Sequence, residues 1–270
     1  MEESILAQKS RVKWLAEGDQ NTRFFHNSIK TRINKNKFVS LTLEDGSFTS
    51  DVSIIKQQVV SHFSSLLGPD QIPYPGKSSF APFVSKRIEP QHVEALDSEV
   101  TSEEIKSALF SIHPNKAPGP DGFNGFFFQQ VWHIIGDHFV AAIKYFFSSG
   151  RLLREVNSTI IALIPKSKNP SCLNDYRPIS CCNTIYKCIS KILANRLKGI
   201  LPAIIDNAQS AFIRGRSISD NILLTQELLH NYHRKDTSAR CAIKADILKA
   251  FDSVHWEFLW DLLDCMAFPP

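Results

Sequence analysis

Residues 241–252 constrain the fold more than any other stretch of the chain. They read Cys-Ala-Ile-Lys-Ala-Asp-Ile-Leu-Lys-Ala-Phe-Asp. From position 241 to 246 small and apolar residues alternate with other residues, a period of two that predicts a half-buried β-strand. Such a strand carries Asp246 to its C-terminal end, beside a turn, where a carboxylate is a natural ligand for Mg²⁺. One carboxylate does not bind two metal ions, so the other ligands must be sought elsewhere in the sequence.

Length and composition limit the class of protein. The chain has 270 residues, 43% of them hydrophobic, which is enough for one large or two modest domains with a sizeable core. The sequence contains no run of 18 apolar residues, the length that would predict a membrane-spanning helix. Its acidic, polar start does not resemble a secretory signal. Six cysteines include no Cys-x-x-Cys pair, so zinc spacing is absent. We therefore expect an intracellular protein with reduced thiols.

Positive charge is concentrated in one part of the chain. Residues 151–200 contain nine Lys and Arg but only two Asp and Glu, while the whole chain has a net charge of +4. A local excess of this kind is typical of a surface that binds phosphates. A solvated basic helix face explains it equally well, and charge alone does not separate the two interpretations.

Hydrophobic spacing predicts a helix-rich α+β fold. A hairpin is expected around Asp45-Gly46, a short strand at residues 160–164, and a linker at residues 68–82, which contain four prolines and two glycines. Helices are expected at residues 4–30, 53–67, 99–112, 123–150, 187–200, 222–232 and 253–263.

Five motifs follow one another in an informative order. They are Lys-Ala-Pro-Gly-Pro-Asp-Gly-Phe (116–123), Ile-Ala-Leu-Ile-Pro-Lys (161–166), Asn-Asp-Tyr-Arg-Pro-Ile-Ser (174–180), Gln-Ser-Ala-Phe-Ile-Arg-Gly-Arg-Ser-Ile (209–218) and the strand that ends at Asp246. Over about residues 100–270 the series resembles the reverse transcriptase of non-LTR (LINE-type) retrotransposons, particularly those of plants. Residues 8–19, with Phe24-Phe25-His26, resemble the segment that precedes the polymerase in such elements.

The resemblance implies an architecture and a reaction. The fold would be the fingers and the start of the palm of a right-hand polymerase, after a helical N-terminal extension. We expect an N-terminal extension and linker at residues 1–85, a helical segment at 86–150 and a partial polymerase domain at 151–270. The implied reaction adds dNTPs to a DNA primer or target on an RNA template. The resemblance also implies a nuclear location and no membrane partner. The oligomeric state stays open.

The same resemblance assigns roles around the nucleotide. Asp246 matches the first metal-binding aspartate of the palm, where Mg²⁺ would activate the primer hydroxyl and stabilise the leaving pyrophosphate. Lys166 and Arg177 match basic fingers residues that bind the triphosphate. Phe251 matches the aromatic residue below the sugar, which excludes a 2′-hydroxyl. Asp252 precedes a helical run and is interpreted as a helix cap more than as a metal ligand.

A second set of residues resembles the segment that contacts the template strand. Phosphate contacts by its two arginines would weaken with salt. Surface charge is the alternative for the basic residues, and the 116–122 turn could be wholly structural. The template set is Gln209, Phe212, Arg214, Gly215 and Arg216.

The chain departs from the family pattern after Asp246. The family's second catalytic element is an aromatic-x-Asp-Asp hairpin, and this sequence contains no Asp-Asp. We therefore expect a polymerase truncated within the palm and inactive by itself, because metal-binding carboxylates act as a unit. The alternatives are a non-catalytic nucleic-acid-binding remnant, a pseudogene product without function, and a maturase-like protein.

Overall fold

The computed structural model describes residues 22–36, 38–43, 45–68, 73–230, 232, 241–246 and 254–269. The chain divides into two compact units, each built from two stretches of sequence. Unit 1 comprises Met1–Gly68 and Ser102–Ile189, and unit 2 comprises Pro69–Thr101 and Ser190–Pro270. The division into segments 1–85, 86–150 and 151–270 stays a prediction about sequence, since the compact units are interleaved along the chain.

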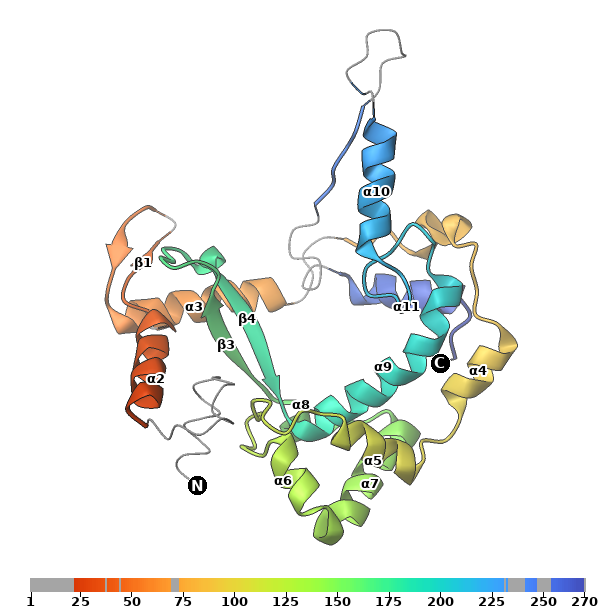
Figure 1. The fold of residues 1–270 in the computed structure, drawn as a ribbon, viewed down its shortest axis with the longest axis horizontal. Helices are drawn as coiled ribbons and strands as arrows, with labels where there is room; N and C mark the ends of the chain where they lie inside the picture. The colour runs from red at the N-terminus through yellow and green to blue at the C-terminus, as the bar shows by residue number, and fades with distance from the viewer. Residues whose placement is uncertain are drawn as a thin grey trace. The chain divides into compact units, whose positions relative to one another are not determined.

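The helical core of unit 1 consists of α5 (Ser102–Phe110), α6 (Gly125–Gln130) and α7 (Trp132–Ser149), which lie together (Figure 1). Ile105, Leu109 and Ile143 are fully buried in it. The side chain of Asn124 accepts a hydrogen bond from the N–H of Phe127 and begins α6. The helix expected at 99–112 is confirmed, and the region 123–150 forms two helices.

Unit 1 also contains two antiparallel hairpins. Strand β3 (Thr159–Pro165) pairs with β4 (Tyr176–Cys182), and β1 (Leu41–Thr42) pairs with β2 (Phe48–Thr49). The strand at 160–164 and the hairpin at Asp45-Gly46 were expected, but β4 was not, because Pro178 argues against a strand. A two-stranded sheet tolerates it, since Pro is allowed where an N–H needs no partner. The remaining helices are α2 (Thr22–Asn36), α3 (Val52–Leu67) and α8 (Arg154–Asn157).

Helix α9 (Thr184–Ile204) contributes Thr184–Ile189 to unit 1 and its later residues to unit 2. In unit 2 its residues Ile200 and Ile204 pack with Ile88 in a buried cluster. The N–H of Ile88 donates to the carbonyl of Met266 over 3.0 Å, which joins residues far apart in sequence. The other elements of unit 2 are α4 (Pro90–Asp97), α10 (Ile218–Leu229), α11 (Trp256–Cys265) and the 3-10 turns η2 (Lys77–Ser79) and η3 (Ala81–Phe83).

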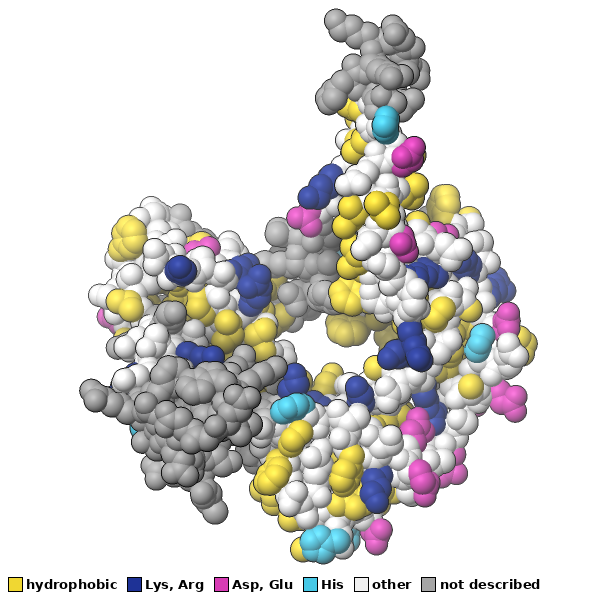
Figure 2. Space-filling view, viewed as in Figure 1, with side chains coloured by type: hydrophobic (Ala, Val, Ile, Leu, Met, Phe, Trp, Pro, Cys, Tyr) yellow, Lys and Arg dark blue, Asp and Glu magenta, His cyan; other side chains and the backbone are white. Residues whose placement is uncertain are grey.

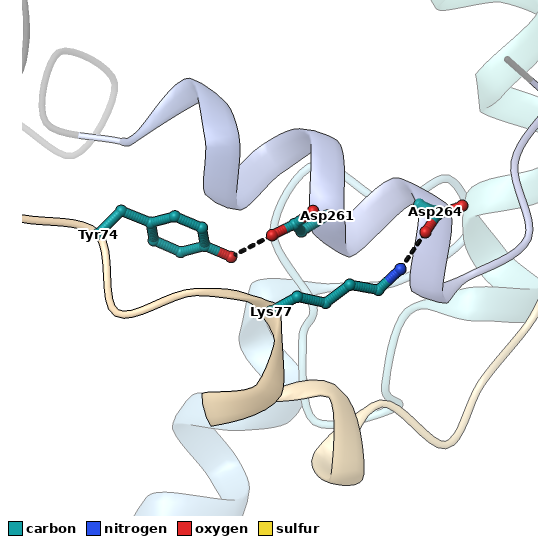
Figure 3. A network of polar contacts seen from close by, with 4 residues as sticks. All are labelled: Tyr74, Lys77, Asp261 and Asp264. Carbon is teal, nitrogen blue, oxygen red and sulfur yellow. Dashed lines mark hydrogen bonds and ion pairs between the residues drawn. The ribbon is translucent and has the colours of Figure 1, made fainter.

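The described part of the expected linker, residues 73–82, is not a free connection. The hydroxyl of Tyr74 donates to Oδ2 of Asp261 over 2.8 Å, and the ammonium of Lys77 pairs with the carboxylate of Asp264 (Figure 3). The ring of Phe80 packs on Phe258, 4.9 Å between centroids. The segment therefore fixes α11 by polar and aromatic contacts, which the proline content of the sequence did not indicate.

Residues 241–246 correct another expectation. All six are exposed and none belongs to a strand, with Ile243 88% exposed. A half-buried strand was predicted here, but a strand needs a neighbour for its backbone N–H and C=O groups, and none pairs with this segment among the described residues. Nearby in sequence, α10 exposes apolar side chains along its length (Figure 2), among them Ile218, Ile222, Leu224 and Leu228.

The contact between Tyr74 and α11 predicts a loss of stability at high pH. Desolvation and the hydrogen bond to Asp261 raise the pKa of Tyr74 from 10.0 to about 12. Since the folded chain binds this proton more tightly than the unfolded chain, the contribution is complete below pH 10 and lost as the pH rises to about 12. The free energy of unfolding should therefore fall more steeply over this interval in the wild type than in Tyr74→Phe.

Urea unfolding followed by tryptophan fluorescence measures this difference, because Trp256 and Trp260 lie on α11. The exposed Tyr145 on α7 supplies a matched control, and Tyr145→Phe should keep the wild-type pH dependence. The pKa of Lys77 is also raised, chiefly by its hydrogen bond to Asp264, but this residue is common to all three proteins. Equal pH slopes in Tyr74→Phe and the wild type would contradict the assignment.

Candidate functional site

The β3–β4 hairpin presents Lys166 and Arg177 at the same end. Arg177 lies opposite Ile164 in the register, and Lys166 follows the last pair, Pro165 with Tyr176. Because side chains alternate between the two faces of a sheet, Ile164, Arg177 and Lys166 share one face. Both basic residues are exposed. The register thus places the two cations that the sequence assigned to a triphosphate at the same end of the hairpin.

The connection between the two strands is fixed by Asp175. Its Oδ2 atom accepts the backbone N–H groups of Ser171 (2.8 Å) and Cys172 (3.1 Å). These donors favour the carboxylate and lower the pKa of Asp175. The ammonium of Lys166 donates to the carbonyl of Asn174 over 2.6 Å, and its remaining N–H groups leave it able to bind an anion. The tip of the hairpin therefore has a defined shape.

The opposite face of the hairpin is packed at this end. Tyr176 is 5% exposed, and its ring stacks on Phe38 with 4.2 Å between centroids. Burial raises the pKa of the Tyr176 phenol. The carbonyl of Ser171 accepts the N–H of Thr42 over 2.8 Å, which ties the connection to β1. One face is thus used for folding while Arg177 and Lys166 face solvent.

The template residues lie together on the loop 206–217, between α9 and α10 in unit 2. Phe212 is 92% exposed and has a φ of 65°, and Gly215 has a φ of 81°. Arg214 is exposed, whereas the guanidinium of Arg216 contacts backbone carbonyls of its own loop and of α9. The side chain of Gln209 also bonds locally, to the carbonyl of Ala211 over 3.2 Å.

Asp246 does not form a metal site with the rest of the described chain. It lies in the exposed segment 241–246, and no group of three or more His, Cys, Asp or Glu side chains able to bind a metal occurs among the described residues. Phe251 and Asp252 lie outside the residues that the structure describes. Among the described residues, Asp246 is therefore the one carboxylate assigned to the metal site, and a single carboxylate does not fit a two-metal centre. In the described part of the chain, no helix is long and apolar enough to cross a membrane.

Comparison with known proteins decides the family. Residues 164–270 match the model of the reverse transcriptase (RNA-dependent DNA polymerase) family. Residues 164–270 belong to the reverse transcriptase family. The match includes Lys166, Arg177, the loop 206–217 and Asp246.

Curated relatives extend the similarity to the earlier part of the chain. The Transposon TX1 uncharacterized 149 kDa protein of Xenopus laevis is 31% identical over 97% of this chain. Retrovirus-related Pol polyproteins of the retrotransposable element R2 are 26% identical over 72% of it in Bradysia coprophila and 25% over 66% in Drosophila melanogaster. The chain spans 20%, 22% and 16% of these three relatives. The resemblance to a retrotransposon reverse transcriptase is confirmed, while the plant type and the truncation stay predictions.

The base of the β3–β4 hairpin depends on two residues that sequence reasoning missed. Asn183, 3% exposed, follows β4, and its Nδ2 donates to the carbonyls of Glu155 (2.9 Å) and Val156 (3.1 Å). Its Oδ1 accepts the N–H of Asp121 over 3.3 Å. Thr184, 1% exposed, donates its hydroxyl to the carbonyl of Phe123 over 2.9 Å.

These contacts give the 116–122 turn a structural role. The ammonium of Lys187 donates to the carbonyl of Ala117 over 2.5 Å, and a Cβ on Gly119 would overlap the backbone of Asn183. The turn therefore packs directly on the start of α9. The Asn-Thr pair before the predicted helix was the signal that could have revealed this anchor, since both residue types are common at helix starts.

Asn183→Ala should destabilise the chain. The substitution leaves two carbonyls and one N–H near the buried side chain without partners, and we expect a cost of about 3 kcal/mol in the free energy of unfolding. Urea unfolding followed by circular dichroism measures it. The side chain of Asn174 is exposed in the hairpin connection, so Asn174→Ala is a matched control that should change stability by less than about 0.5 kcal/mol. Equal effects of the two substitutions would refute the role of Asn183.

Proposed function

We propose that this chain is the nucleotide- and template-binding part of a retrotransposon RNA-directed DNA polymerase. The observation that carries the proposal is the common face of Lys166 and Arg177 at one end of the hairpin, within residues that match the family. An arginine and a lysine on one face suit the oxygens of a triphosphate, for which Arg offers a planar fork and Lys a compact charge. The incoming substrate would be a dNTP and the template RNA, in the nucleus.

The remaining roles follow the family pattern. Phe251 would lie below the sugar of the nucleotide, and the loop 206–217 would contact the template through an exposed aromatic ring and an exposed arginine. Asp246 would be one ligand of Mg²⁺, which supplies Lewis-acid stabilisation of the reacting phosphate when bound. These roles belong to the whole polymerase, of whose relatives this chain spans about a fifth.

The triphosphate role predicts weaker nucleotide binding when either cation is removed. Lys166→Ala and Arg177→Ala should each weaken dATP binding about tenfold, because a charge-assisted hydrogen bond contributes about 1.5 kcal/mol. Equilibrium dialysis with labelled dATP measures the dissociation constants. Lys168 is exposed in the same connection and provides the control, because Lys168→Ala removes an equal charge from outside the proposed site. If Lys168→Ala weakened dATP binding as much as the two variants do, the effect would come from general electrostatics and not from the proposed site.

The metal site predicts the catalytic behaviour of the chain alone. With Asp246 and no Asp-Asp pair, the 270-residue chain should show no Mg²⁺-dependent extension of a primer on an RNA template. Incorporation of labelled dNTP is compared with that of Asp246→Ala, and the two should be equal. Incorporation above the Asp246→Ala background would show that the chain catalyses the reaction by itself.

A non-catalytic nucleic-acid-binding role is the second candidate. The exposure of Phe212 and Arg214 favours it, because base stacking and phosphate contact need no metal. Binding of single-stranded RNA without any extension activity would fit this role and the first equally. Nucleotide binding that depends on Lys166 and Arg177 separates them.

A further inference from the structure

The loop 206–217 contains two arginines, two residues apart, with opposite surroundings. Arg214 is exposed, and no hydrogen bond or ion pair joins its guanidinium to another residue that the structure describes. The guanidinium of Arg216 faces inward. Its Nη1 donates to the carbonyls of Asp206 and Gln209, the latter over 2.7 Å. Its Nη2 donates to the carbonyls of Pro202 (3.2 Å) and Ile205 (3.0 Å).

Arg216 binds one carbonyl at the end of a helix and three in the loop that follows it. The last four C=O groups of an α-helix have no partner inside the helix, and the helix dipole places partial negative charge there. Helix α9 ends at Ile204, so the carbonyl of Pro202 belongs to its last turn. A planar guanidinium with several N–H groups can reach this carbonyl and those of the following loop at the same time. Arg216 therefore connects the end of α9 to the loop after it.

The loop that Arg216 connects is built around two buried side chains. Ser210 and Ile213 are each 9% exposed. The amide of Asn221, on α10, donates to the carbonyl of Ala208 (2.9 Å) and to the hydroxyl of Ser210 (3.0 Å). Phe212 lies between the two buried residues and is almost wholly exposed.

The backbone of Phe212 shows that the loop has a specific conformation. Its φ of 65° is in the left-handed region, which costs a non-glycine residue stability and persists only where the surroundings impose it. Phe212 is 92% exposed, and Arg214, two residues later, is exposed as well. The bond from Arg216 to the carbonyl of Pro202 attaches this loop to α9.

We propose that Arg216 is a positioning residue and not a phosphate ligand: it fixes the loop so that Phe212 and Arg214 meet single-stranded RNA. What the loop binds rests on the proposed function, whereas the attachment of the loop by Arg216 does not. The proposal changes the role that the sequence suggested for Arg216 and leaves that of Arg214 in place.

Four variants of the full chain test the proposal: Arg214→Ala, Arg214→Lys, Arg216→Ala and Arg216→Lys. Thermal unfolding is followed by circular dichroism, and a fluorescein-labelled single-stranded oligoadenylate is titrated at several salt concentrations. Both substitutions of Arg216 should lower the unfolding midpoint by about 5 °C, because an ammonium cannot reach the several carbonyls that a guanidinium spans. Neither substitution of Arg214 should change the midpoint.

RNA binding separates positioning from direct contact. Arg214→Ala should reduce the slope of log affinity against log salt by about 0.7, the change for one phosphate contact on a single strand, and Arg214→Lys should restore it. Arg216→Lys should not restore the affinity that Arg216→Ala loses, and its slope of log affinity against log salt should equal that of the wild type. In this variant, hydrogen–deuterium exchange should rise in residues 206–217 and stay the same in residues 102–112.

The opposite pattern would overturn the proposal. In that pattern, Arg216→Ala would keep the wild-type unfolding midpoint, and its slope of log affinity against log salt would fall by about 0.7. Arg216→Lys would then restore the wild-type slope. A different result would refute the proposed function alone: RNA affinity that none of the four substitutions changes, with a lower midpoint in both Arg216 variants. In that case Arg216 fixes a loop that does not bind RNA.

Discussion

The buried carboxamide of Asn183 is the contact on which the arrangement of unit 1 depends. It joins the end of β4 to two carbonyls of α8 and to the 116–122 turn, three stretches that are separate in sequence. A carboxamide has both donors and an acceptor, so one side chain satisfies groups of both kinds. Without it, three backbone groups would lose their partners at the base of the β3–β4 hairpin. The position of Lys166 and Arg177 at the other end of that hairpin follows from this anchor.

Many basic side chains of the chain bind backbone carbonyls. Lys187 binds Ala117, and Arg216 binds the end of α9. Arg196 donates to the carbonyls of Leu96 (2.9 Å) and Ser98 (2.7 Å), at and just after the end of α4. The excess of positive charge in residues 151–200 therefore has a third explanation beyond a phosphate surface or a solvated helix face. The exposed Arg177 and Arg214 stay available to a ligand, as does Lys166, which uses one N–H group on the carbonyl of Asn174.

The sequence predicted the features that depend on local spacing. Helix α9 follows from the spacing of its apolar residues and strand β3 from a short apolar run, and the family motifs assigned Lys166 and Arg177 to one site. Contacts between distant residues were beyond such reasoning: neither Tyr74 with Asp261 nor Asn183 with Asp121 leaves a local pattern. Strand β4 was missed because Pro178 has a low strand propensity, which the hairpin tolerates.

The segment 241–246 shows that a local pattern can also predict an element that does not form. Its alternation satisfies the local rule for a strand, yet the described residues provide no neighbour with which it could pair. Strand formation depends on a partner that a sequence period does not supply. In the same way, the two arginines of the loop 206–217 are alike in sequence, and only the carbonyls around Arg216 distinguish their roles.

The central claim is that the solvent-facing end of the β3–β4 hairpin binds the triphosphate of a nucleotide. Photo-crosslinking tests it most directly, with a dNTP that carries a photoreactive group on its γ-phosphate and mass spectrometry of the modified peptides. We expect labelling in peptides that contain Lys166 or Arg177, and unlabelled dATP should suppress this labelling. Labelling that unlabelled dATP suppresses only in other parts of the chain would contradict it.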